Sequence, residues 1–384
     1  MTSSAWTRWL RRSIPACAAA AAFAVWLAPA PVIARQVEVA TAPQAAASLP
    51  DKLSDKEFWK IVSEFSEESG YFQSDNLVGN ERPLQNVVPA LREMKRGGVY
   101  LGVAPDQNFT YIAALEPKMA FIVDIRRGNL LAHLMYKAIF EMSDDRADFL
   151  SMLFSRKRPR ELSGKSTPAE LFAAFRAAEP DETLFNDNLR RITERLTKTH
   201  GFDLSEADFS GNGGLNYVYG MFFRYGPELT YASSGSGGRG GRNNMPTYAD
   251  LQQATDMEGR NHAYLSDEEH FGILKKLEER NLLVPVVGDF AGPKALRAVG
   301  KYIADHGATV TAYYTSNVEQ YLFQNGVWPA FYTNVSTLPL EDTSVFIRSA
   351  RGSNLLDPIR SLLTEFSERR IQIYSDVTRR GSIK

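Results

Sequence analysis

Apolar and polar positions follow two kinds of pattern along residues 98–129. Two short, nearly continuous apolar runs, Val99–Val103 and Met119–Val123, flank a stretch with helical spacing, Asn108–Glu116. Unbroken apolar runs are typical of parallel strands buried on both faces, whereas half-exposed strands alternate. Pro117 ends the intervening helix, because proline lacks a backbone donor. The pattern therefore predicts two parallel strands joined by a right-handed helical crossover.

The same succession of strands and helices resumes beyond residue 266. Apolar runs at Leu282–Val287, Ala308–Tyr314 and Val345–Arg348 predict further strands, and helices are expected between them. Strands that alternate with helices are the signature of a parallel sheet covered on both faces. We therefore predict an α/β fold with a doubly wound, mainly parallel sheet of the Rossmann type, in one domain that spans residues 51–384.

Residues from about 143 to 265 interrupt this succession because they lack strand signals. They predict a mainly helical insertion. Within it, the alternating aromatics of Tyr217–Tyr225 would also fit a strand, but the length of the segment and the following Gly226 favour a helix. The glycine-rich run Ser233–Arg242 lacks the spacing and lysine of a phosphate-binding loop, so we expect a surface loop there.

Several helix starts are marked by a capping box, in which the side chains of a serine or threonine and of a glutamate three residues later bond to each other's backbone N–H. The pattern occurs at Ser54 and Glu57, Thr167 and Glu170, Ser266 and Glu269, and Ser316 and Glu319.

A polar, turn-rich segment, Tyr71–Glu81, precedes a predicted helix near Leu84–Met94 and the first strand. Two interpretations stay open for this leading part of the chain. It could fold over a ligand, as such segments do in nucleotide-binding folds, or it could provide a helix that covers one edge of the sheet.

The N-terminus has the layout of a secretory signal peptide. Residues 1–34 contain three arginines, an apolar stretch and a small-residue end, and the alanine- and proline-rich residues 35–50 predict a flexible linker. We therefore expect an exported protein, periplasmic or secreted, that touches a membrane only through the N-terminal segment. An uncleaved anchor is the alternative. The only cysteine, Cys17, lies in this segment.

Net charge and histidine spacing limit the kinds of ligand or partner that the sequence indicates. The formal net charge is −1, which does not indicate a nucleic acid partner. The histidines lack the spacing of a metal site, and His133 is expected on a helix surface. The last dozen residues, which include Arg379 and Arg380, are expected to be a solvated end. No protein partner can be inferred, so a small-molecule ligand is the remaining expectation.

Candidate binding residues follow the ends of the predicted strands. They are the turn Gly102–Asn108, Asp124, Gly288–Asp289 and Thr315–Glu319. Because the carboxyl ends of parallel strands share one rim, these segments should converge on one crevice. Gly102 would let the backbone approach a ligand, and the following helix start would offer N–H groups. Asp124 could accept bonds from ribose hydroxyls or cap a helix, and Asp289 could act as a general base or cap the next helix.

The segment Gly98–Asp124 resembles the cofactor-binding half of class I S-adenosylmethionine-dependent methyltransferases, which have a glycine loop followed by an acidic residue at the end of the second strand. Val284–Ala295 and Tyr314–Phe323 are also similar to a bacterial family with a methyltransferase-like Rossmann fold and no established activity. The sequence departs from the methyltransferase pattern. Tyr100 replaces an acidic residue, and of the glycines only Gly102 remains.

This resemblance implies S-adenosylmethionine as the cofactor and assigns roles to particular residues. Asp289 or Asn317 would orient the methyl acceptor. The residues implied in cofactor binding are Gly102, Ala104, Pro105, Asp106, Gln107, Asn108, Asp124 and Arg126.

Two other functions remain open. Export would separate the protein from S-adenosylmethionine, which is made in the cytoplasm, so an exported ligand-binding or scaffold protein without turnover is the main alternative. A dinucleotide enzyme, with Arg126 or Arg127 meeting a 2′-phosphate, is a weaker one, because the later glycines of that motif are absent.

Overall fold

The computed structural model describes residues 48–233 and 245–380. The predicted signal peptide, the linker as far as residue 47 and nearly all of the glycine-rich run Ser233–Arg242 lie outside the described residues. The described residues belong to one compact unit, Ala46–Lys384. Within them, no helix is both long enough and apolar enough to cross a membrane.

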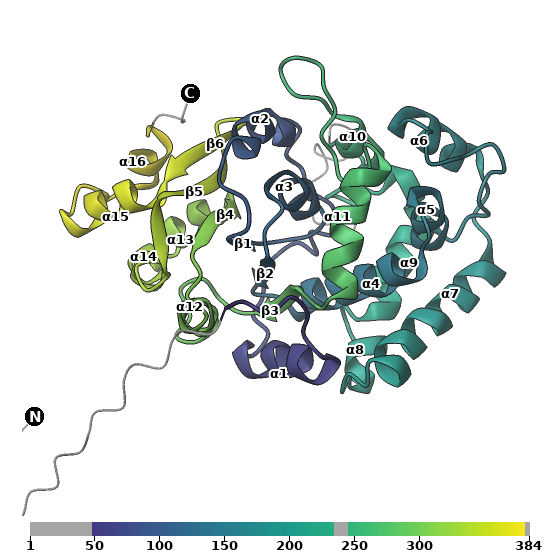
Figure 1. The fold of residues 1–384 in the computed structure, drawn as a ribbon, viewed down its shortest axis with the longest axis horizontal. Helices are drawn as coiled ribbons and strands as arrows, with labels where there is room; N and C mark the ends of the chain where they lie inside the picture. The colour runs from purple at the N-terminus through teal and green to yellow at the C-terminus, as the bar shows by residue number, and fades with distance from the viewer. Residues whose placement is uncertain (1–47, 234–244, 381–384) are drawn as a thin grey trace, which may run out of the picture. The chain divides into compact units, whose positions relative to one another are not determined.

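A six-stranded sheet forms the centre of this unit, in the order β3-β2-β1-β4-β5-β6 (Figure 1). Neighbouring strands are parallel from β3 to β5, and β6 runs antiparallel to β5. The structure is therefore α/β with a mostly parallel sheet, compatible with the predicted Rossmann-like fold. The strands are β1 (Val99–Gly102), β2 (Met119–Asp124), β3 (Leu283–Val287), β4 (Val310–Ser316), β5 (Leu340–Ala350) and β6 (Ser353–Pro358).

The apolar runs located β1 to β4 closely because these strands are buried along almost their whole length. The last two strands were harder to find. β5 begins well before the predicted Val345, because its first residues, 340–343, are partly or fully exposed and form no apolar run. The antiparallel β6 was not predicted.

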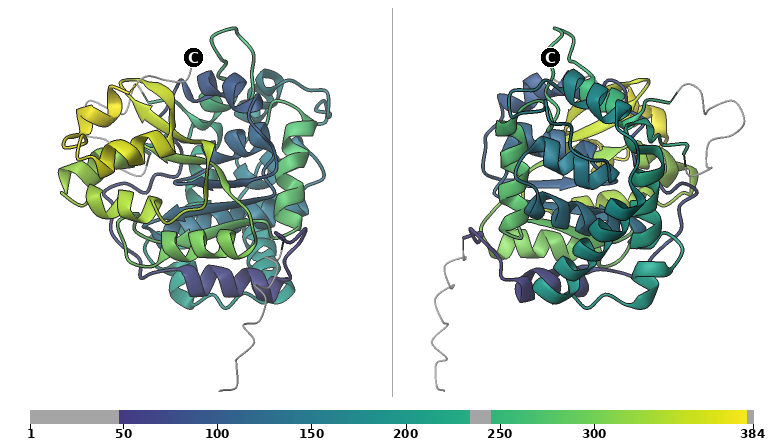
Figure 2. Two further views of the ribbon diagram at one scale, coloured as in Figure 1. Left: turned by 60° about the vertical axis from the view of Figure 1, so that its left-hand side comes forward. Right: turned by 90° about the vertical axis from the view of Figure 1, so that its right-hand side faces the viewer.

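Helices cover both faces of the sheet (Figure 2). On one face, the crossover helix α3 (Gln107–Leu115) packs with α11 (Glu268–Glu279), which also contacts α4 (Arg127–Met142). On the other face, α12 (Ala295–Asp305) lies against β2, with α1 (Asp55–Phe65) beside it. The remaining helices of the sheet region are the 3₁₀ helix η1 (Leu84–Val87), α2 (Val88–Arg92), α13 (Val318–Gln324), α14 (Trp328–Val335), α15 (Ile359–Ser367) and α16 (Tyr374–Thr378).

Between β2 and β3, the described residues form helices and loops, with two isolated β-bridges. The aromatic segment Tyr217–Tyr225 is helical, as predicted, and forms most of α9. Besides α4 and α11, this part contains α5 (Arg146–Phe154), α6 (Pro168–Ala177), α7 (Glu182–Glu194), the π-helical turn η2 (Arg195–Thr199), α8 (Glu206–Ser210), α9 (Leu215–Tyr225), the 3₁₀ turn η3 (Gly226–Glu228) and α10 (Tyr248–Gln253).

The prediction that His133 lies on a helix surface is wrong. His133 is on α4 and is buried, because α4 is covered on several sides by neighbouring helices. Its ring packs edge-on against Phe109 of α3, and Nε2 lies 3.0 Å from the carbonyl oxygen of Ala104. Burial lowers the pKa of His133 to about 4, so the ring is neutral at physiological pH.

The capping boxes at Ser54 and at Thr167 are confirmed at the starts of α1 and α6. The other two predictions are wrong. Asp267, rather than Ser266, caps α11. No side chain caps α13, because the hydroxyl of Ser316 bonds to Glu81, and Glu319 pairs with Arg348.

The described residues of the predicted solvated end, 373–380, are instead partly buried. Val377 and Thr378 of α16 are buried, and Arg380 pairs with the buried carboxylate of Asp357 at the end of β6, with Nε 2.9 Å from Oδ2. This contact holds the C-terminal helix on the sheet. It depends on β6, which the sequence pattern did not reveal.

Candidate functional site

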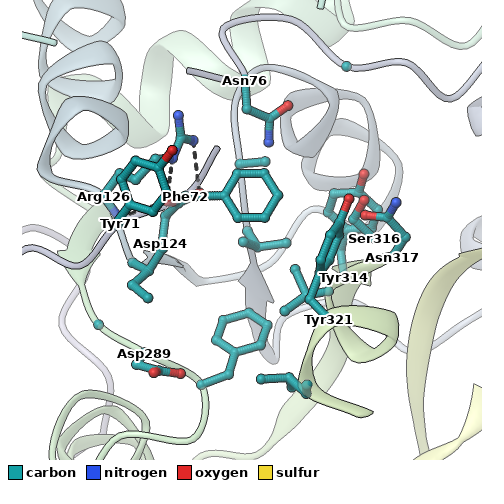
Figure 3. Close-up of a pocket in the computed structure, with 18 of the residues that line it drawn as sticks. Tyr71, Phe72, Asn76, Asp124, Arg126, Asp289, Tyr314, Ser316, Asn317 and Tyr321 are labelled. Atoms are coloured by element: carbon teal, nitrogen blue, oxygen red, sulfur yellow. Dashed lines mark hydrogen bonds and ion pairs between the residues drawn. The ribbon is translucent and has the colours of Figure 1, made fainter. Parts of the chain in front are cut away.

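A pocket of about 180 Å³ lies at the carboxyl ends of the parallel strands, where β1 and β4 lie side by side but lead to opposite halves of the sheet (Figure 3). The structure brings together four segments that are far apart in the sequence, one after each of β1, β2, β3 and β4. Their lining residues are Val103, Ala104, Gln107, Asp124, Ile125, Arg126, Gly288, Asp289, Phe290, Ser316, Asn317 and Val318.

The rest of the lining includes the segment between α1 and η1, residues 66–81, which we call the N-terminal strap. The strap crosses the carboxyl ends of the strands, with the Glu67 N–H donating to Val287 O and the Gly70 N–H donating to Ile125 O, both at 2.8 Å. The strap therefore covers the end of the sheet where the pocket lies, and that it folds over a ligand stays a prediction. The second interpretation, a helix at one edge of the sheet, fits η1, which packs against the edge strand β6. The pocket-lining residues of the strap are Tyr71, Phe72, Asn76, Gly79 and Asn80.

Glu67 of the strap also fixes the loop after β3. Its carboxylate accepts the backbone N–H groups of Lys294 and Ala295, both at 2.8 Å, and that of Asp289 at 3.1 Å. Glu67, rather than Asp289, therefore caps the start of α12, where a carboxylate also complements the helix dipole. The Asp289 carboxylate instead accepts the N–H of Ala291 at 2.9 Å, at the wall of the pocket.

Asp124, the last residue of β2, pairs with Arg126 at one side of the pocket (Figure 3). The backbone N–H of Arg126 donates to Asp124 Oδ1 at 2.9 Å, and its guanidinium reaches both carboxylate oxygens at 3.2 and 3.3 Å. The same guanidinium donates to the strap carbonyls of Ser74 and Asp75. Asp124 thus holds the arginine that helps to fasten the strap.

The loop after β1 is held by its own side chains. Asn108 donates to the carbonyl oxygens of Val103 and Pro105, and its Oδ1 accepts the Tyr100 hydroxyl at 2.9 Å. A Cβ on Gly102 would overlap Asn108 Oδ1. The glycine predicted to make room for a ligand therefore makes room for Asn108.

Asp106 points away from the pocket. Its side chain is buried, and Oδ2 accepts the side-chain N–H of Gln252 on α10 at 3.0 Å. Burial raises the pKa of Asp106 to about 7. The carboxylate that the resemblance implied in cofactor binding thus belongs to the interior between α3 and α10.

The pocket therefore contains part of the predicted set. Of the residues implied in cofactor binding, Ala104, Gln107, Asp124 and Arg126 line the pocket, as do Asp289 and Asn317, whereas Gly102, Pro105, Asp106 and Asn108 do not line it.

On the opposite wall of the pocket, sequence reasoning found Ser316, within the candidate segment Thr315–Glu319, but missed Tyr314 and Tyr321 (Figure 3). The Tyr314 hydroxyl accepts the side-chain N–H of Gln107 at 2.9 Å and donates to Glu81 at 2.8 Å. Ser316 adopts a left-handed backbone conformation, with φ 52°. For Tyr314 the available signal was its position near the end of a buried strand, where functional side chains gather in parallel sheets.

Aromatic side chains form much of the apolar lining. Phe72 of the strap and Tyr321 of α13 meet edge to face, with ring centroids 5.1 Å apart, and Phe290 lies after β3. Within residues 48–233 and 245–380, no group of three or more His, Cys, Asp and Glu side chains could hold a metal ion.

A comparison with known protein families gives a match. No curated protein matches the chain. Residues 77–201 and 239–371 match the family described as Domain of unknown function (DUF7790), which covers the strap end, the strands and most of the pocket. That description specifies no activity or ligand, so the resemblance to methyltransferases stays a prediction. Because the match covers more than half of the sequence, the chain belongs to the DUF7790 family.

Proposed function

We propose that this protein binds S-adenosylmethionine in the pocket and transfers its methyl group to a second substrate. The observation that carries the proposal is the position of the pocket. It lies outside the carboxyl ends of the strands, beside the β1–β4 pair at which the strand order reverses. Nucleotide-type ligands bind at this switch point in open α/β sheets.

Asp124 is the proposed ribose-binding residue. Each carboxylate oxygen can accept about two hydrogen bonds, and Arg126 does not exhaust that capacity. Arg126 donates two bonds to Oδ1 and one to Oδ2, so Oδ2 can accept one ribose hydroxyl while the arginine stays in place. Phe72 and Phe290 would provide aromatic surface for the adenine.

Methyl transfer makes modest demands on side-chain chemistry. The reaction mainly requires that donor and acceptor be aligned, so the proposal needs no catalytic triad. Asp289 and Asn317 line the pocket on different loops, and we assign them to orienting the acceptor.

The pairing of both arginines argues against a dinucleotide with a 2′-phosphate. The Arg126 guanidinium already donates hydrogen bonds to Asp124 and to two carbonyl oxygens of the strap. Arg127 pairs with Asp208, with Nη2 2.9 Å from Oδ2. A phosphate would have to displace one of these carboxylates.

Calorimetry of the full chain with S-adenosylmethionine and with S-adenosylhomocysteine tests the proposal. Both should bind, and Asp124→Asn should weaken both by about 1–2 kcal/mol, or roughly five- to thirtyfold, because the ribose hydroxyl then meets a neutral amide instead of a charged acceptor. The control is Asp144→Asn, an exposed aspartate beyond the far end of α4, which should leave both affinities unchanged.

The two main hypotheses give different results. If the folded wild-type protein binds neither compound, methyl transfer is refuted and the non-catalytic, exported ligand-binding protein becomes the better account. Binding that survives Asp124→Asn would remove the assignment of the ribose site.

A further inference from the structure

Glu81, at the end of the N-terminal strap, is a buried carboxylate without a counter-charge. Its side chain accepts bonds from neutral donors: the Tyr314 hydroxyl at 2.8 Å, the Ser316 hydroxyl, and the Asn354 amide at 2.7 Å. No lysine, arginine or histidine of the described residues forms an ion pair with it. Burial raises the pKa of Glu81, as expected for an acid that is removed from water without a cation.

Two buried carboxylates of the described residues, Asp106 and Glu278, also lack an ion pair, but unlike Glu81 neither accepts a hydrogen bond from a side chain that lines the pocket. Other buried carboxylates are compensated by a cation. Glu319 and Asp357 share the buried guanidinium of Arg348. An unpaired buried carboxylate is costly to keep ionised, so its presence beside a pocket points to a role in that pocket.

Glu81 lies directly behind the pocket wall. Gly79 and Asn80, its neighbours in the chain, line the pocket, as do Tyr314 and Ser316, whose hydroxyls it accepts. A ligand that touches either hydroxyl is therefore one side chain away from the carboxylate. The left-handed conformation of Ser316 is uncommon for a residue with a side chain, and such conformations gather at functional sites.

We propose that the pocket selects a ligand that carries a positive charge, and that Glu81 is the residue that recognises this charge. The inference rests on the proposed function, because S-adenosylmethionine carries a sulfonium that S-adenosylhomocysteine lacks. The faces of Phe72 and Tyr321 add to the same selectivity, since aromatic faces attract cations.

This selectivity would favour turnover. In the transfer step the acceptor's electron pair forms a bond to the methyl carbon, the carbon–sulfur bond breaks, and its electron pair stays on sulfur, which becomes a neutral thioether. Any proton on the acceptor passes to solvent. The attraction to Glu81 ends when the sulfonium charge disappears, so the product is held less tightly than the donor.

The test compares the affinities of S-adenosylmethionine and S-adenosylhomocysteine for the wild-type chain and for Glu81→Gln, measured by calorimetry at low salt. The wild type should prefer the charged ligand by about tenfold or more, because a unit charge about 12 Å away already gives a tenfold effect at an effective dielectric constant of about 20, and a closer charge gives a larger one. Glu81→Gln should remove this preference and change the affinity for the neutral ligand by less than about twofold. Glu64→Gln, on the exposed face of α1, is the matched control and should keep the preference.

A purely structural role for Glu81, as a link between the strap and the ends of β4 and β6, makes a different prediction: Glu81→Gln would weaken both ligands by the same factor. That result overturns the inference and leaves the proposed function standing. Failure of the wild type to bind either ligand overturns both.

Circular dichroism establishes whether Glu81→Gln is folded. If Glu81→Gln is not folded, the affinities of the wild type for the two ligands test the inference instead. Equal affinities for the two ligands refute charge selection, and a preference of about tenfold or more that falls as salt is added supports it.

Discussion

Asp106→Asn should stabilise the protein at high pH and have little effect at low pH. Asp106 is buried between α3 and α10, where its Oδ2 accepts from Gln252 and its Oδ1 has no partner among the described residues. Gln252 Oε1 also lacks a donor there. An amide at position 106 would be neutral at every pH and would carry the donor that a carboxylate lacks.

The size of the stability gain follows from the pKa of Asp106 in the unfolded chain and in the folded protein. Burial raises the pKa of Asp106 from 3.8 to about 7. Between these values the folded protein holds a proton that the unfolded chain has lost, so the stability that this group contributes falls as the pH rises. The difference of about three pH units corresponds to about 4 kcal/mol, because each unit is worth about 1.4 kcal/mol.

Urea unfolding of wild type and variant at several pH values between 4 and 8 measures this effect. The gain in the free energy of unfolding should be close to zero near pH 4 and approach about 4 kcal/mol at pH 8. Taking the difference at each pH cancels the titration of all other groups. Asp144→Asn, at an exposed position, serves as the control. A gain that does not change with pH, or a loss at pH 8, would refute the reasoning.

Two further predictions concern stability and are measured by urea unfolding. Arg348→Met should destabilise the protein by about 3–5 kcal/mol, because it leaves the buried carboxylates of Glu319 and Asp357 without their cation; a cost below about 1 kcal/mol would contradict this. Gly102→Ala should cost about 1–3 kcal/mol through its overlap with the loop that follows β1, whereas Gly220→Ala, in open space on α9, should gain up to about 1 kcal/mol. Equal effects at the two glycines would refute the packing argument.

The sequence predicted the sheet well because its signal is local. A parallel strand buried on both faces must be apolar throughout, so Val99–Val103 and Met119–Val123 could be recognised from a few residues each. The convergence of the strand ends followed from the same prediction, since parallel strands share one carboxyl edge. β6 was not predicted because an antiparallel strand at the sheet edge has no such unbroken apolar run.

The polar contacts of the site could not be predicted in the same way. Glu67 caps a helix that lies far along the chain, and Ser316 gives its hydroxyl to Glu81 instead of the nearby helix start. Capping boxes describe bonds over three residues, so they fail wherever a distant partner competes. The burial of His133 likewise depends on which helices cover α4, which no spacing along α4 reveals.

The bond between Glu67 and the start of α12 also bears on biosynthesis. Glu67 leaves the ribosome 228 residues before Ala295, which supplies one of the amides that its carboxylate binds. A nascent chain that has not yet reached Ala295 cannot join the N-terminal strap to the loop after β3, so the pocket is still incomplete. A small molecule can therefore protect the completed protein against unfolding, but it cannot guide the early stages of folding on the ribosome.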